Sequence, residues 1–131
     1  MSGTWVLNEK RSRFADGMHP GQVTLTIQHD DPKLKYDGST NNPEEGQNRD
    51  FHFDGAIDGK AYVVKQDGGD RNVTFHRTGD RVVESVSNGP AGEIRSRITM
   101  SHDGNTLERR MTLHGKDGKT RTWVEVYEKK K

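Results

Sequence analysis

The chain has 131 residues, with 21 Lys and Arg against 20 Asp and Glu, a formal net charge of +1, and no cysteine. This charge balance provides no strong field to attract nucleic acid or an anionic membrane, and the absence of cysteine excludes disulfides and thiolate chemistry. No apolar run approaches 18 residues, so we expect no membrane span. Because alternating sequence begins at Thr4, we expect a cytoplasmic protein, unless a native secretory leader has been removed.

The length indicates one domain, residues 1–131. Leu, Ile, Val and Phe total 23 of 131 residues, about 18 %, a low value that often accompanies disorder. The high net charge of disordered chains is missing, however. We therefore expect a sheet with one apolar face, closed around an interior that either holds water and a ligand or is packed with mixed side chains.

Turn signals divide the chain at short intervals. Asp-Gly occurs seven times, at Asp16-Gly17, Asp37-Gly38, Asp54-Gly55, Asp58-Gly59, Asp67-Gly68, Asp103-Gly104 and Asp117-Gly118. This dipeptide suits a two-residue hairpin, because both central positions need positive φ, which Gly adopts freely and Asp tolerates. Closely spaced hairpins predict an antiparallel meander.

The alternating segments between these turns give ten candidate strands. They are Thr4–Asn8, Gln22–His29, Lys33–Thr40, Gln47–Asp54, Lys60–Gln66, Arg71–Arg77, Arg81–Ser87, Glu93–Ser101, Asn105–His114 and Lys119–Lys129. Between the first two, Glu9–Phe14 predicts a short helix that ends before Asp16-Gly17. We expect an all-β, antiparallel up-and-down barrel of eight to ten strands with this helix after strand one.

Each two-residue loop also predicts which side chains share a face. Closing on Gly79-Asp80 gathers Val73, Phe75, Arg77, Val82, Glu84 and Val86. Closing on Asp103-Gly104 gathers Ile94, Ser96, Ile98, Met100, Leu107, Arg109, Met111 and Leu113. Closing on Asp117-Gly118 adds Thr122, Val124 and Val126 and turns Trp123 and Tyr127 outward, whereas a three-residue loop with a bulge would reverse this last assignment.

Two charged residues stand out inside this apolar face. Glu84 lies between Val82 and Val86, and Arg109 lies between Leu107 and Met111. An unpaired buried charge costs several kcal/mol, so each must have a partner or reach water. The two side chains are candidates to pair with each other or to serve a site.

Short motifs at both ends resemble a known superfamily. Gly3-Thr4-Trp5 resembles the Gly-x-Trp signature of calycins, which include lipocalins and fatty-acid-binding proteins. Val126-Tyr127-Glu128-Lys129 resembles the last strand of fatty-acid-binding proteins, and the whole chain is similar to small bacterial lipocalin-like proteins. The resemblance implies a ligand-binding barrel, and it implies that Arg121 packs against Trp5.

Two departures from the fatty-acid-binding family bear on the ligand. Residues 9–21 are too few for the two lid helices of that family. In that family an Arg accompanies the final Tyr, whereas the residue two before Tyr127 in this chain is Glu125. These departures argue against a fatty-acid carboxylate site, and a basic or neutral ligand suits Glu125 and Glu84 better if the two side chains face inward.

The leading hypothesis is binding or transport of a small amphipathic or hydrophobic molecule in the barrel, by a monomer or homodimer that needs no cofactor or metal and binds no nucleic acid. The candidate ligand-binding residues are Phe51, Phe53, Tyr62, Phe75, Glu84, Arg109, Met111, Trp123, Glu125 and Tyr127. A second hypothesis is a cofactor-free lyase, isomerase or hydrolase, with Glu84 as general base and Arg109 stabilising an anion. A third is a haem-binding barrel with His52 or His76 as the iron ligand; the six histidines are otherwise scattered.

Overall fold

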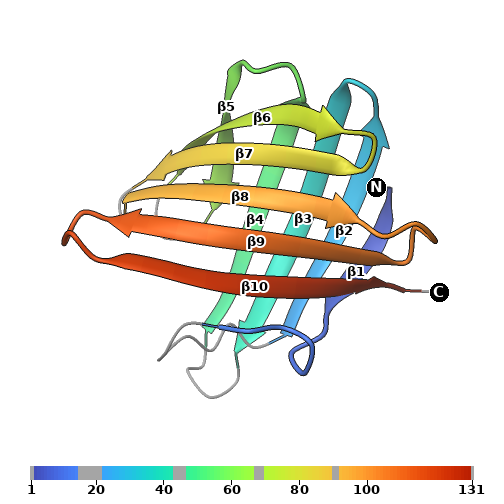
Figure 1. The fold of residues 1–131 in the computed structure, drawn as a ribbon, viewed down its shortest axis with the longest axis horizontal. Coiled ribbons are helices and arrows are strands. Elements are labelled where there is room, and N and C mark those ends of the chain that lie inside the picture. The colour runs from blue at the N-terminus through green and yellow to red at the C-terminus, as the bar shows by residue number, and fades with distance from the viewer. Residues whose placement is uncertain (1, 15–21, 43–46, 67–69, 90–91, 131) are drawn as a thin grey trace.

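The computed structural model describes residues 2–14, 22–42, 47–66, 70–89 and 92–130. These residues form ten β-strands (Figure 1). The strands are β1 Gly3–Leu7, β2 Gln22–Asp30, β3 Lys33–Asn42, β4 Gln47–Ala56, β5 Ala61–Gln66, β6 Arg71–Gly79, β7 Val82–Gly89, β8 Gly92–Met100, β9 Thr106–Gly115 and β10 Thr120–Lys129. All ten overlap the strands predicted from the alternation.

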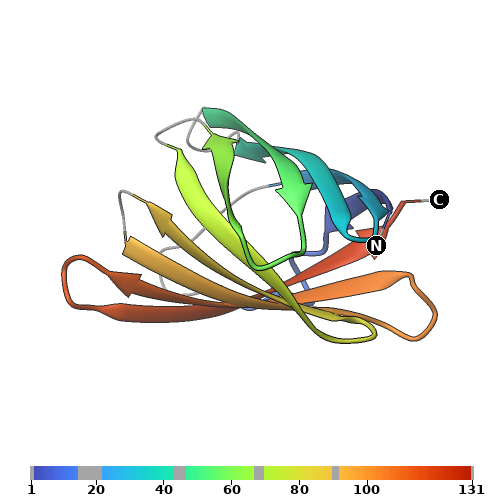
Figure 2. The same ribbon diagram turned by 90° about the horizontal axis from the view of Figure 1, so that it is seen from above.

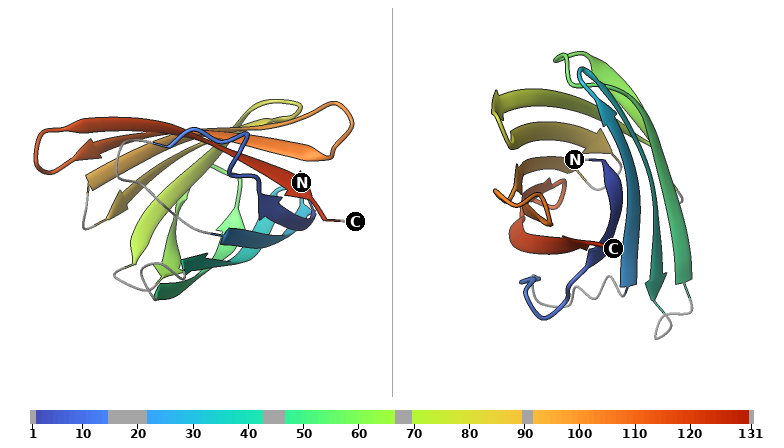
Figure 3. Two further views of the ribbon diagram at one scale, coloured as in Figure 1. Left: turned by 90° about the horizontal axis from the view of Figure 1, so that it is seen from below. Right: turned by 90° about the vertical axis from the view of Figure 1, so that its right-hand side faces the viewer.

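The strands close into one antiparallel barrel in the order β1-β10-β9-β8-β7-β6-β5-β4-β3-β2. Strand β1 completes the closure, because Trp5 pairs with Lys129 of β10 on one side and with Leu25 of β2 on the other. In Figure 1, β6–β10 cross in front of β2–β4, and Figures 2 and 3 show these two layers from the side. The predicted up-and-down barrel is confirmed, because each of the ten described strands pairs with a neighbour on both sides.

The predicted helix after strand one is not present. Glu9–Arg11 form one turn, in which the Asn8 side-chain Oδ1 accepts hydrogen bonds from the backbone N–H groups of Lys10 and Arg11 at 3.1 and 3.2 Å. The chain then forms an antiparallel bridge, with two 2.7 Å backbone hydrogen bonds between Arg13 and Val124 of β10. Because the barrel takes both backbone polar groups of Arg13, the turn cannot propagate as a helix, and no helix occurs among the described residues.

The five Asp-Gly dipeptides among the described residues occur in two different structures, and Asp16-Gly17 and Asp67-Gly68 lie outside the described residues. Gly59, Gly104 and Gly118 lie in turns with φ between +74° and +80°, and each preceding Asp accepts a hydrogen bond from the backbone N–H two residues on. No described residue other than Gly has positive φ, so these are not the two-residue hairpins expected from the sequence.

Gly38 and Gly55 instead lie inside β3 and β4; the predicted strand Lys33–Thr40 already contains Gly38, whereas Gly55 follows the predicted end of its strand at Asp54. A Cβ at Gly38 would overlap the Phe51 ring, and a Cβ at Gly55 would lie 2.6 Å from Phe53 Cζ. Glycine is required at both positions because aromatic side chains occupy the space of a Cβ.

The β6–β7 hairpin reverses the predicted face of β7. A bulge between Arg77 and Gly79 places Arg77 opposite Val83, and Phe75 opposite Ser85. Val83 and Ser85 are accordingly buried, while Glu84 lies on the outer face, half-buried, with Arg97 of β8 as its cross-strand neighbour. The prediction that Glu84 lies within the apolar face is wrong, because one extra residue enters the loop.

The β8–β9 hairpin has the predicted register, whereas the β9–β10 hairpin has the alternative one. Strands β8 and β9 pair as predicted, with Ile98 opposite Arg109 and Met100 opposite Leu107. The β9–β10 hairpin has a longer loop, closed by a 2.9 Å hydrogen bond from Gly115 N to Lys119 O, with Gly118 at φ +80°. This is the three-residue alternative, so Trp123, Glu125 and Tyr127 point inward and Val124 points outward.

Two groups of buried side chains fill opposite parts of the barrel. One is centred on Trp5, fully buried, with Leu7, Val23, Leu25, Leu107 and Tyr127. The other is centred on Phe53, also fully buried, with Leu34, Val64, Val73, Phe75 and Val83. Ile27, Phe51 and Ile98 contact both groups, so the interior is continuous. Within the described residues, no helix is long and apolar enough to cross a membrane.

Candidate functional site

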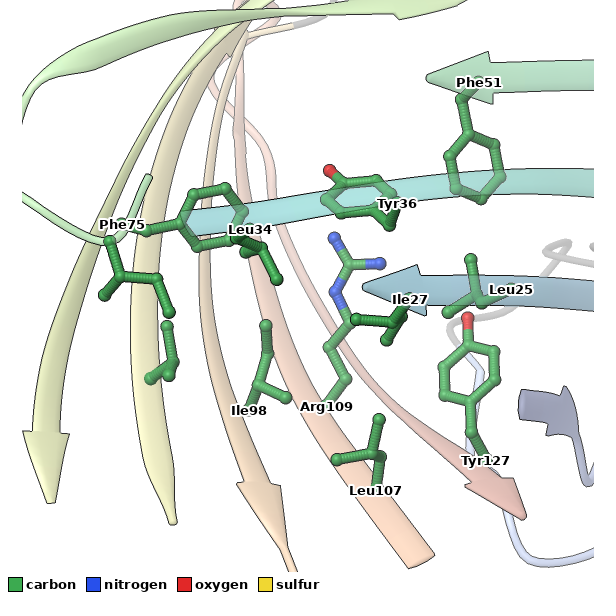
Figure 4. Close-up of a pocket in the computed structure, with 12 residues that line it drawn as sticks. Leu25, Ile27, Leu34, Tyr36, Phe51, Phe75, Ile98, Leu107, Arg109 and Tyr127 are labelled. Atoms are coloured by element: carbon green, nitrogen blue, oxygen red, sulfur yellow. The ribbon is translucent and has the colours of Figure 1, made fainter. Parts of the chain in front are cut away.

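The barrel encloses a cavity with two adjoining compartments. The first has a volume of about 60 Å³ and is mainly apolar (Figure 4). Its walls come from both layers and consist of Leu25, Ile27, Leu34, Tyr36, Phe51, Ile57, Phe75, Val83, Ile98, Leu107, Arg109 and Tyr127. Strands β2, β3 and β9 each contribute two wall residues, which are alternate residues because successive side chains of a strand point to opposite faces of the sheet.

The second compartment has a volume of about 160 Å³ and a more polar wall. It shares Tyr36, Phe51, Phe75 and Arg109 with the first compartment. The rest of its wall is Val64, Arg71, Val73, Ser85, Ser87, Ile94 and Met111. The cavity therefore passes from a hydrocarbon-like region to one with guanidinium and hydroxyl groups, as an amphipathic occupant requires.

Arg109 projects from β9 into the middle of the cavity, toward Tyr36 of the opposite wall (Figure 4). Its Nη1 lies 3.9 Å from the Glu125 Oε1 atom of β10. Its Nε is buried and has no hydrogen-bond partner among the described residues. A donor of this kind, left unsatisfied inside a barrel, costs free energy unless an occupant accepts its hydrogen bond.

The Glu125 carboxylate accepts hydrogen bonds from the side chains beside Arg109. It accepts a 2.7 Å hydrogen bond from Trp123 Nε1 and a short hydrogen bond from the Tyr127 hydroxyl. The Glu125 side chain is 15 % exposed. Because two hydrogen-bond donors and the Arg109 charge converge on one carboxylate, its charge is largely satisfied within the protein.

The ionisation of the neighbouring groups follows from this arrangement. Burial raises the pKa of Tyr127 well above its ordinary value, and the Glu125 charge raises it further, so the hydroxyl stays protonated and donates. Burial also raises the pKa of Tyr36. Burial opposes the charge on Arg109, but Glu125 and the two tyrosines outweigh it and raise the Arg109 pKa, so the guanidinium stays charged.

Arg71 supplies the second guanidinium. Its Nη2 donates to the Gly92 carbonyl oxygen at 2.9 Å, and its Nε donates to Ser87 Oγ at 3.3 Å. Burial lowers the pKa of Arg71, and no described carboxylate forms an ion pair with it. It therefore differs from Arg109, whose charge faces Glu125.

Most of the residues predicted to bind a ligand do come together in the barrel. Phe51, Phe75, Arg109, Met111 and Tyr127 line the cavity. Trp123 and Glu125 lie behind Arg109 and Tyr127, as described above.

The remaining predicted site residues lie apart from the cavity. Phe53 is buried core and stacks on Tyr36 with ring centroids 5.1 Å apart. Tyr62 lies on the inner face of β5 and packs edge-on against Phe53, but it does not line the cavity and donates a 2.7 Å hydrogen bond to Asp58 Oδ2. Glu84 lies on the outer surface and does not meet Arg109, so the proposed acid–base pair has no common site.

The two histidines considered for haem also lie outside the barrel. His52 contacts the Asp37 carboxylate on the outer face of β3 and β4, and His76 is exposed on β6. Among the described residues, no cluster of three or more His, Asp or Glu side chains could hold a metal ion. The cation that packs on Trp5 is Lys129, with Nζ 5.9 Å from the ring centroid, rather than Arg121, which is exposed.

The sequence-based prediction missed Tyr36 and Arg71. Both follow from alternation within their own strands: Tyr36 is two residues from Leu34, and Arg71 is two residues before Val73. Extending the predicted inner face of β6 by one step toward its start would have placed Arg71 inside. The polarity of both residues made them look like surface positions.

Comparison with known proteins defines the fold. The chain matches no protein-family model and no curated protein sequence. Among solved structures, it is similar to Rv2717c from M. tuberculosis, with 15 % identity, TM-score 0.64 and coverage of 99 % of this chain and 92 % of that chain. It is also similar to a mutant of the fluorescent protein UnaG, with 16 % identity, TM-score 0.68 and coverage of 100 % and 96 %.

A third similar structure is the zebrafish ileal bile acid-binding protein in complex with cholic acid. It has 13 % identity, TM-score 0.63 and coverage of 98 % of both chains. These matches cover nearly the whole of each chain and confirm the β-barrel fold expected from the sequence. At such identities they establish the shared fold.

Proposed function

We propose that this protein binds a small amphipathic molecule inside the barrel. The observation that carries the proposal is the buried Arg109 Nε, which has no partner among the described residues and faces a cavity whose other wall residues are mainly apolar. An occupant with an apolar body and a hydrogen-bond acceptor would satisfy this donor and cover the apolar wall. The bile-acid complex of the structurally similar zebrafish protein supports the same class of ligand.

The ligand occupies the apolar compartment with its body and places an acceptor near Arg109. Burial of its apolar surface contributes about 25 cal/mol per Å², so affinity grows with the size of the body until the walls must move. Two small compartments of about 60 and about 160 Å³ favour a single chain or a compact ring system over a large rigid ligand.

Fluorescence titration with N-phenyl-1-naphthylamine, an uncharged hydrophobic probe, tests the proposal. We expect saturable binding with enhanced emission at one site per chain. The variant Ile98→Trp fills the apolar compartment from β8 and should weaken binding at least tenfold. The matched control Arg97→Trp introduces the same side chain at the adjacent, exposed position and should bind as the wild type does.

Circular dichroism and thermal unfolding of both variants show whether each remains folded. Equal probe binding by folded Ile98→Trp and by the wild type would contradict the proposal, because the cavity would then not be the binding site. Absence of saturable binding by the wild type would also contradict it.

A further inference from the structure

The charge balance inside the cavity is positive. Arg71 and Arg109 are the charged side chains among the described residues that line its two compartments. Glu125 lies against Arg109, with an oxygen 3.9 Å from Nη1, and compensates that guanidinium. Arg71 has no such carboxylate within the described part of the chain, so its charge is available to a ligand.

Arg71 is held in a fixed position at the polar end of the cavity. Its guanidinium donates to the Gly92 carbonyl and to the Ser87 hydroxyl, as described above. The side chain crosses Gly89, where a Cβ would lie 2.6 Å from Nη1 and 2.8 Å from Cγ. The absence of a side chain at Gly89 therefore provides the space in which Arg71 lies, and this reduces the entropy that the guanidinium would lose on binding a ligand.

The surrounding groups can complete an anion site. Arg71 Nη1 makes no hydrogen bond with the described residues. The hydroxyls of Ser87, which donates to the Ile94 carbonyl oxygen at 3.5 Å, and of Ser85, which pairs with Ser96, lie along the same wall. Serine hydroxyls rotate and can donate to an anion. A guanidinium with neighbouring hydroxyls is suited to a carboxylate, because hydrogen bonds between charged groups are about twice as strong as neutral ones.

We propose that Arg71 and Ser87 form the binding site for an anionic head group, so that the physiological ligand is an amphipathic carboxylate whose apolar body extends past Phe75 into the apolar compartment. This inference rests on the proposed function and specifies its ligand class. The carboxylate binds at Arg71 rather than at Arg109, because the Glu125 carboxylate beside Arg109 repels a second anion, so the acceptor that meets Arg109 Nε is an uncharged group of the ligand. The outward orientation of Glu84 removes one of the two negative charges that favour a basic ligand, and the hydrogen bonds from Trp123 and Tyr127 satisfy the other, on Glu125.

Competition between matched ligands tests the assignment. Octanoate and octanol share an eight-carbon chain and differ in head-group charge, and each is titrated against bound N-phenyl-1-naphthylamine. We expect Arg71→Gln to weaken octanoate roughly tenfold or more and to leave octanol within about twofold. Arg71→Lys should retain part of the octanoate affinity. Arg97→Gln, which removes an exposed positive charge on the outer face of β8, should leave both affinities unchanged.

The outcomes separate the inference from the function on which it rests. Unchanged octanoate affinity in folded Arg71→Gln, with normal binding of the probe, would overturn the anion site alone. Equal weakening of octanoate and octanol would also overturn it, since Arg71 would then support the wall rather than the head group. Failure of the wild type to bind the probe would overturn both the anion site and the proposed function.

Discussion

Replacing Glu125 by Gln removes the charge on which the polar centre of the barrel depends. At 3.9 Å, the attraction between Arg109 and Glu125 is about 4 kcal/mol for an effective dielectric constant of about 20. The desolvation of both groups offsets part of it. Gln keeps one acceptor oxygen, so it can replace one of the hydrogen bonds from Trp123 and Tyr127 but presents an NH₂ group to the other donor.

We therefore expect Glu125→Gln to lower the free energy of unfolding by about 2–4 kcal/mol, since it weakens one hydrogen bond to a charged acceptor and leaves the Arg109 charge unpaired. Urea unfolding followed by tryptophan fluorescence measures this loss. The control Glu128→Gln removes an exposed charge of the same strand, whose partner is Arg11, and should cost less than about 1 kcal/mol. Equal effects of the two substitutions would refute the reasoning, because the Glu125 carboxylate would then not hold the buried network.

Three further predictions follow from particular contacts. Ser96→Ala leaves the buried Ser85 hydroxyl without its partner and should cost about 1 kcal/mol, whereas adding Ser85→Ala should cost little more; additive losses in urea unfolding would contradict the pairing. Gly38→Ala places a Cβ against Phe51 and 2.7 Å from Leu25 Cδ2, so thermal unfolding should show a loss of about 1–3 kcal/mol, and unchanged stability would show that Phe51 can move freely. Hydrogen bonds from Arg77 and then from His29 lower the pKa of Asp31, so its contribution to stability is present above its ordinary pKa and is lost as the pH falls through the lower, folded value. The stability difference between the wild type and Asp31→Asn should therefore shrink between about pH 5 and about pH 3, and a pH-independent difference would contradict this assignment.

Periodicity in the sequence predicted the number and position of the strands, because alternation is a direct consequence of the pleat. It predicted the faces of β8 and β9 for the same reason. It misplaced β7 and left β10 undecided, because a single extra loop residue exchanges the two faces of a strand. Asp-Gly occurs both in turns and within strands, and the room that Phe51 requires at Gly38 is visible only in three dimensions.

The candidate site was predictable where apolar residues mark it and was missed where polar residues form it. Phe51, Phe75 and Met111 followed from the apolar face, whereas Arg71 resembled any surface arginine. The role of Glu125 depended on the length of the loop before β10. Polar residues that line a cavity cannot be told from surface residues by their type alone, since their inward orientation is set by the strand register across several hairpins.

Methyl NMR tests the central claim, binding inside the barrel, most directly. The chain contains four isoleucines, Ile27, Ile57, Ile94 and Ile98, and all four line the cavity. Val63 is exposed on β5 and serves as an internal control. On titration with N-phenyl-1-naphthylamine, we predict saturable shifts of the isoleucine methyl resonances that fit one affinity and leave Val63 in place, because ring currents act at short range. Shifts confined to Val63 and other outward methyl groups, with the four isoleucines unmoved, would contradict binding inside the barrel.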